Sequence, residues 1–171
     1  SGGVSVLSES IPLPEPMTSY ALRLLEHVGW HGVAMVEFKV EEDSGRPLLM
    51  EVNGRFWGSL QLAIDSGVNF PVLLYNLATR SEAGLPSTEY RTGIRLRWLL
   101  GDLDHLLLYL FKDRADLHLP RGATSSKLTK FLEFLKFYQR GMHYEVLRLA
   151  DPLPFAYELK HFICSLFQRA S

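Results

Sequence analysis

The chain has 171 residues, of which 47% are hydrophobic, so it is long enough to bury one core, or one core with a helical extension. Its formal net charge of −1 predicts no attraction to nucleic acid or to an acidic membrane surface. The single Cys164 excludes an internal disulfide, which favours a reducing, cytoplasmic setting. The longest apolar run, residues 106–111, is too short to cross a bilayer, so we expect no membrane span.

The first third of the chain predicts a strand, a helix and a hairpin. Residues 4–7 are strand-like, and residues 17–28 repeat apolar side chains at helical spacing after a Pro-Glu-Pro sequence. Residues 30–40 and 48–52 are two further strand-like runs, and the sequence between them, Glu-Asp-Ser-Gly-Arg-Pro, favours a turn. Two strands joined in this way predict an antiparallel β-hairpin.

Beyond the hairpin the pattern predicts mainly helices, separated by a loop at 80–88 and breaks at 117–122 and 151–154. The helices are expected at residues 58–66, 71–79, 102–112, 126–140 and 157–169. Residues 89–99 alternate as a strand with Arg91, Arg95 and Arg97 on one face. These arginines either line a cleft for an anionic substrate or pair with acids such as Asp102 and Asp104.

Polar residues alternate along the second strand of the predicted hairpin. Glu51, Asn53 and Arg55 are two residues apart, so their side chains leave the same face. If the turn is centred near Ser44, the numbers of paired residues sum to 88, which puts Glu37 directly opposite Glu51. Two facing carboxylates repel each other, and a divalent cation between them would remove the repulsion.

The donor types in this cluster indicate the ligands that it suits. Mg²⁺ prefers carboxylate and amide oxygens, so Glu37, Glu51 and Asn53 form a candidate metal site. Arg55 carries a forked donor suited to phosphate or carboxylate. The alternative is a solvated strand face on which the carboxylates pair with Lys39 and Arg55.

Residues 32–71 closely resemble the C-terminal half of the ATP-grasp superfamily, in particular its carboxylate–amine ligase and carbamoyl-phosphate-synthase-like branch; their sequence is GVAMVEFKVEEDSGRPLLMEVNGRFWGSLQLAIDSGVNFP. In that family the first strand carries an acidic metal ligand, matched by Glu37. The second strand carries a Glu-x-Asn pair, matched by Glu51 and Asn53. The arginine that follows, matched by Arg55, lies near the transferred phosphate or the acyl substrate. The resemblance covers about residues 1–80.

The resemblance implies an enzyme that uses ATP and Mg²⁺, or Mn²⁺ in its place, to activate a carboxylate as an acylphosphate for attack by an amine or other nucleophile. Glu37, Glu51 and Asn53 would hold the metal and the nucleotide phosphates. Arg55 would also bind the nucleotide and act as the catalytic residue that neutralises developing charge. Gly54 and the two aromatic residues after Arg55 differ from the better-known synthetases, which leaves the acyl substrate open.

The resemblance also implies an α+β fold, with an antiparallel sheet and flanking helices in residues 1–80. We expect residues 81–171 to add a strand and a helical extension packed on that domain. In the family the adenine pocket and the phosphate-holding lysines lie mostly upstream of the matched stretch. The chain is therefore expected to be a fragment, inactive or nearly so alone, whose partners are ATP, a small carboxylate and the upstream half of the same polypeptide.

Two other functions are consistent with the sequence. The chain could be a non-catalytic ATP-grasp-like module that serves in ligand binding or protein interaction. The helical half from about Asp102 could bind a partner chain or a second copy in a homo-oligomer, because several of its helices carry apolar faces. A Mg²⁺ and ATP titration separates the first alternative from the enzyme, and light scattering tests the second.

Overall fold

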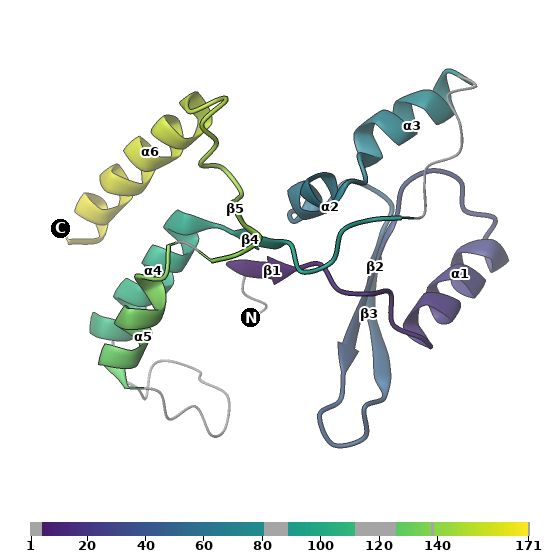
Figure 1. Ribbon diagram of the computed structural model, residues 1–171, viewed down its shortest axis with the longest axis horizontal. Coiled ribbons are helices and arrows are strands. Elements are labelled where there is room, and N and C mark those ends of the chain that lie inside the picture. Colours follow the sequence, from purple (N-terminus) through teal and green to yellow (C-terminus); the bar gives the residue numbers. More distant parts are fainter. Residues whose placement is uncertain (1–4, 81–88, 112–125, 138, 171) are drawn as a thin grey trace. The chain divides into compact units, whose positions relative to one another are not determined.

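The computed structural model describes residues 5–80, 89–111, 126–137 and 139–170, and the fold is α+β as predicted (Figure 1). It also has the predicted helical C-terminal extension. In chain order the elements are β1 (Leu7–Glu9), α1 (Met17–His27), β2 (Met35–Val40), β3 (Pro47–Asn53), α2 (Leu60–Ser66), α3 (Phe70–Ala78), β4 (Arg95–Arg97), α4 (Leu99–Phe111), α5 (Lys127–Phe134), β5 (Met142–Tyr144) and α6 (Leu153–Ala170).

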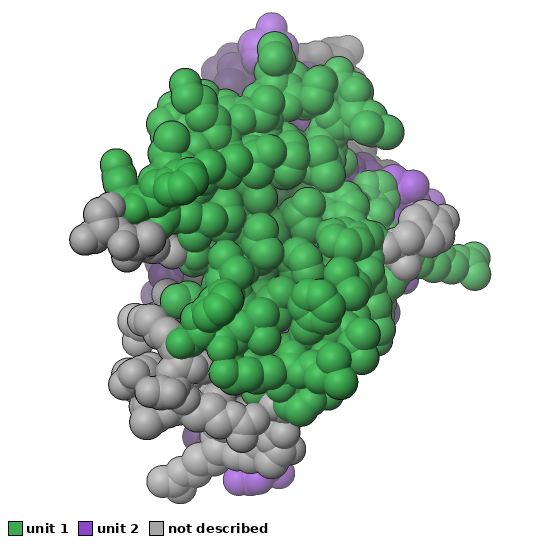
Figure 2. All heavy atoms as spheres, turned by 90° about the vertical axis from the view of Figure 1, so that its left-hand side faces the viewer, with its two compact units in different colours: residues 1–8, 95–171 green, residues 9–94 purple. Residues whose placement is uncertain are grey.

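The chain forms two compact units, which Figure 2 colours separately. Unit 1 contains residues 1–8 and 95–171, and unit 2 contains residues 9–94. The expected domains, an ATP-grasp part in residues 1–80 and a strand with a helical extension in residues 81–171, stay a prediction. Within the described residues, no helix combines the length and the apolar content needed to cross a membrane.

The strands form two small sheets. β2 and β3 pair as the predicted antiparallel hairpin, and β4 lies between β1 and β5 in a three-stranded sheet. The β4–β5 pairing is parallel, with Arg95 opposite Met142 and Arg97 opposite Tyr144. The sequence pattern does not predict β5, because three residues are too few to show a periodicity.

Several predicted boundaries differ from the structure for local reasons. β2 begins at Met35 and not at residue 30, because Gly32 has a φ of +114°, which interrupts an extended strand. α6 begins at Leu153, four residues before its predicted start, because Pro154 is tolerated in the first turn of a helix. α5 ends at Phe134, well before residue 140. The loop predicted at 80–88 and the break at 117–122 lie almost entirely outside the described residues.

The buried core of the described residues lies in unit 1, on β4 and α4. It consists of four apolar side chains: Leu96, Leu100, Leu106 and Tyr109. The sequence predicts a buried or covered α4, and this holds for the first three turns. The last residue of the helix, Phe111, is 82% exposed.

A buried arginine joins three elements of unit 1. Arg97 is only 4% exposed, and its guanidinium donates through Nε to Asp102 Oδ2 at 2.8 Å. It also donates through Nη2 to the carbonyl of Phe134 at 2.8 Å and lies 4.9 Å from the centre of that ring. A cation at the C-terminal end of a helix is favourable, because the carbonyls there carry partial negative charge. Arg97 therefore fixes β4 and the end of α5 to the first turn of α4.

Replacing Asp102 by alanine leaves the Arg97 charge buried with only carbonyl partners, so we expect a loss of about 3 kcal/mol in the free energy of unfolding. Chemical denaturation followed by circular dichroism measures this loss. The matched control is Glu133→Ala, because Glu133 forms an exposed ion pair with Lys130 at 2.8 Å and should cost less than about 1 kcal/mol. Equal losses in the two variants would contradict the role given to Arg97.

Candidate metal and phosphate site

The register of the β2–β3 hairpin places the predicted carboxylates opposite each other. Glu37 pairs with Glu51, Val36 with Val52 and Met35 with Asn53, as expected for partner numbers that sum to 88. Because alternate residues of a strand share a face, Asn53 lies on the face of Glu51. The structure thus brings two carboxylates and one amide of the candidate site to one face near the end of β3.

A β-bulge separates this part of the hairpin from its tip. Beyond Glu37 the register shifts, so that Phe38 pairs with Leu49 and the partner numbers sum to 87. If the register of the tip continued, Glu37 would face Met50 and not Glu51. The bulge therefore creates the carboxylate pair, in keeping with the frequent use of bulges to redirect side chains beside active sites.

Both carboxylates of the pair are exposed, and Asn53 is half-buried. Asn53 donates from Nδ2 to Glu51 Oε1 at 2.5 Å, which orients the amide. Among the described residues, neither Glu37 nor Glu51 has an ion-pair partner, and the amide oxygen of Asn53 accepts no hydrogen bond. These oxygens keep their capacity to bind a cation.

The arginine of the motif does not neutralise the carboxylates. Arg55 is exposed, and its Nη1 donates to the main-chain carbonyl of the next residue, Phe56, at 2.9 Å. Lys39 forms no ion pair with either carboxylate in the described part of the chain. The pairing of Glu37 and Glu51 with Lys39 and Arg55, which is the alternative interpretation, is not found there.

Sequence reasoning missed the part played by Trp30. Its indole lies directly on Gly54, where a Cβ atom would come within 2.7 Å of Trp30 Cζ2, a distance that real Cβ contacts do not show. The indole Nε1 donates to the carbonyl of Val33 at 3.2 Å. Gly54 therefore lets Trp30 pack on the backbone between Asn53 and Arg55. Only the departure of Gly54 from the family pattern hinted at this contact.

A second aromatic contact positions the segment after Arg55. Trp57 is half-buried and meets Phe70, the first residue of α3, edge to face, with ring centres 5.2 Å apart. α3 itself is capped by Asn69, whose side chain accepts from the N–H of Val72. Trp57 thus anchors the segment after the motif to the start of α3.

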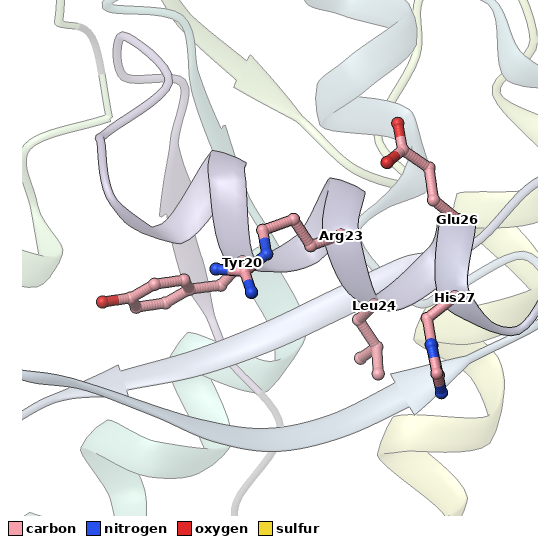
Figure 3. Close-up of a pocket in the computed structure, with 5 residues that line it drawn as sticks. All are labelled: Tyr20, Arg23, Leu24, Glu26 and His27. Atoms are coloured by element: carbon pink, nitrogen blue, oxygen red, sulfur yellow. The ribbon is translucent and has the colours of Figure 1, made fainter.

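Other parts of unit 2 are less suited than the candidate site to hold a metal or a ligand. Among the described residues, no group of three or more His, Cys, Asp or Glu side chains is arranged to hold a metal, so the candidate site consists of two carboxylates and an amide. A hollow of about 650 Å³ lies along α1 (Figure 3). There Leu24 and His27 point to one side of the helix and Glu26 points away from them. Its lining residues all come from this one helix, so we do not assign it a function.

The three arginines of the second part have separate partners. Arg91 donates to the carbonyl of Asp65 at 2.5 Å, and Arg95 to Gln139 Oε1 at 2.8 Å. Arg97 pairs with Asp102, as one of the two predicted alternatives proposes.

Residues 5–101 match a protein-family model described as "ATP-grasp in the biosynthetic pathway with Ter operon". The match spans more than half of the chain and includes the whole hairpin, so this chain belongs to the ATP-grasp superfamily, whose members are ATP-binding enzymes of the ligase type. Within that superfamily, it belongs to the family that this model describes. Neither the curated proteins nor the solved structures contain a match.

Gly54→Ala should displace the Trp30 indole and lower the free energy of unfolding by about 1–3 kcal/mol, the usual cost of overpacking. Denaturation with tryptophan fluorescence as the readout measures both effects. Gly58→Ala is the control, since a Cβ there meets no atom within 4 Å and should change stability by less than about 0.5 kcal/mol. An unaltered Gly54→Ala protein would mean that Trp30 does not pack on this glycine.

Proposed function

We propose that the β2–β3 hairpin is the metal-binding and phosphate-transfer part of an ATP-dependent ligase of the carboxylate–amine type. The observation that carries this proposal is the facing of Glu37 and Glu51 with no neutralising cation among the described residues. Like charges opposite each other destabilise a sheet, so their placement favours a bound cation. Family membership supplies the class of reaction.

The donor set fits Mg²⁺, with Mn²⁺ as a substitute. Glu37, Glu51 and Asn53 offer hard oxygen donors, and their exposure leaves room for the water and phosphate ligands that Mg²⁺ retains. These three residues would hold the metal, which would neutralise negative charge on the nucleotide phosphates. The hydrogen bond from Asn53 to Glu51 keeps the amide nitrogen turned to the carboxylate and the amide oxygen available.

Arg55 follows the three metal ligands and is exposed, so its guanidinium can reach an anion. In the proposed reaction the substrate carboxylate attacks the γ-phosphorus of ATP, and the bond to the bridging oxygen breaks, which forms an acylphosphate and ADP. An amine then displaces phosphate from the acyl carbon and loses a proton. Arg55 would stabilise the charge that develops on the transferred group.

The family resemblance puts the adenine pocket and the phosphate-holding lysines mostly upstream of the matched stretch, and the proposal assigns no residue of this chain to them. The isolated chain is accordingly expected to bind a divalent metal but to form little or no ADP. The carboxylate and the nucleophile are not specified beyond their chemical classes.

Mn²⁺ titration of the chain, followed by electron paramagnetic resonance of the free ion, tests the metal site. We expect Glu37→Gln and Glu51→Gln each to weaken Mn²⁺ binding by about tenfold or more, because each removes a charged ligand. Glu42→Gln, in the hairpin turn, removes the same charge away from the site and should leave the affinity within about twofold. Equal affinities in all three variants would refute the site and favour a non-catalytic module.

Arg55→Ala should lower the rate of ADP formation by the parent enzyme by about 100-fold, since it removes a donor to the transferred group. The same change should leave Mn²⁺ affinity nearly unaltered, because Arg55 bonds to the carbonyl of Phe56 and not to the carboxylates. Arg46→Ala, in the hairpin turn, is the matched control and should keep nearly full activity. A normal rate in Arg55→Ala would exclude the catalytic role.

A further inference from the structure

A cavity of about 770 Å³ lies in unit 1, between α4 and α6. Its described lining combines aromatic and aliphatic side chains with two carboxylates and two histidines, and it contains no lysine or arginine. The side chains that determine its chemical character are Trp98, Leu100, Leu108, Glu158 and Phe162. A largely apolar cavity with a few fixed polar groups is the usual form of a small-molecule site.

Glu158 is the polar group that this cavity holds in place. Its Oε1 accepts a hydrogen bond from the indole Nε1 of Trp98 at 2.5 Å. Its Oε2 is buried and has no hydrogen-bond partner among the described residues. A buried carboxylate oxygen without a donor is costly and uncommon, so Glu158 offers a strong acceptor to a charged donor once a small rotation of its side chain exposes Oε2 to the cavity.

The aromatic wall of the cavity is fixed by a glycine. A Cβ atom at Gly101 would come within 2.6 Å of Trp98 Cζ3, so the indole lies directly on the backbone of α4. The Trp98 ring is thus held by Gly101 on its face and by Glu158 at its N–H. A rigid aromatic ring beside a carboxylate is the arrangement that attracts an organic cation, through the negative face of the ring.

The negative charge of Glu158 affects the pKa of a neighbouring acid, Glu145. Burial raises the pKa of Glu145, the negative charge of Glu158 raises it further, and Arg148 opposes both effects. Glu145 and Glu158 are therefore close enough for their charges to interact. A second cavity, of about 570 Å³, differs in composition, because its lining includes Lys130 and Lys136 as well as Glu133.

We propose that the cavity between α4 and α6 binds a small organic cation, namely a primary amine carried on an apolar body. The ammonium group would donate to the Glu158 carboxylate, the Trp98 and Phe162 rings would contact the cation and its body, and the two leucines would complete the apolar wall. This site is separate from the metal site on the hairpin, and it does not depend on phosphate transfer.

Calorimetric titration of the full chain with three probes of one apolar body tests the proposal. The probes are phenethylamine, phenethyl alcohol and phenylacetate, which are cationic, neutral and anionic at pH 7. We expect phenethylamine to bind at least about tenfold more tightly than the alcohol, because the alcohol cannot form a charge-assisted hydrogen bond with the Glu158 carboxylate. Phenylacetate should bind most weakly, because its own carboxylate is repelled by that of Glu158. Equal affinity for amine and alcohol, or tighter binding of phenylacetate, would overturn the proposal.

Glu158→Gln keeps the shape of the side chain and removes its charge, so it should weaken phenethylamine binding by about tenfold and leave the alcohol unaffected. Glu133→Gln, which changes the second cavity, is the control and should bind the amine normally. Unchanged amine binding in Glu158→Gln would overturn the assignment.

A measurement on the unmodified chain keeps the test decisive if Glu158→Gln fails to fold. In nitrogen–proton correlation spectra, phenethylamine should shift the indole N–H signal of Trp98 and leave those of Trp30 and Trp57 in place. Shifts of the other two signals without that of Trp98 would locate the amine elsewhere and reject this cavity.

Discussion

The facing of Glu37 and Glu51 across the hairpin is the constraint on which the proposed chemistry depends. A ladder that places two carboxylates opposite each other loses stability, and nothing in the described residues restores it by an ion pair. The β-bulge after Glu37 shows that this placement does not follow from the turn, whose own register would put Met50 there. Glu37 and Glu51 are therefore the one pair of this hairpin that brings two like charges opposite each other.

Unit 1 contains the opposite case, a buried charge that has partners. Arg97 is buried, but Asp102 and two main-chain carbonyls near the end of α5 satisfy its donors, and two aromatic rings cover it. Four of the five N–H donors of this guanidinium have partners, so its charge stabilises the packing of β4, α4 and α5. The contrast with Glu37, Glu51 and Glu158 separates a charge that holds the fold together from the charges that we propose to bind ligands.

The local sequence pattern is sufficient to predict the hairpin and most helices, because the apolar periodicity and the turn residues that determine them lie within a few positions of each other. It places Glu37 opposite Glu51 by assuming a regular turn, and this pairing is correct although the tip has another register. The burial of Arg97 and the existence of β5 depend on partners about 40 residues away, so the local sequence pattern does not predict them. The chemical roles of the paired carboxylates and of Arg55 remain proposals.

The contact between Trp30 and Gly54 has a consequence for comparing this chain with its relatives. The Trp30 indole lies on the bare backbone of Gly54, so a larger residue at position 54 requires a change at position 30 as well. A relative with a larger residue at position 54 needs a smaller side chain, or a different loop, at position 30. Searches that score each position of the motif independently would rank such relatives too low, whereas a search that treats the pair as one unit would recover them.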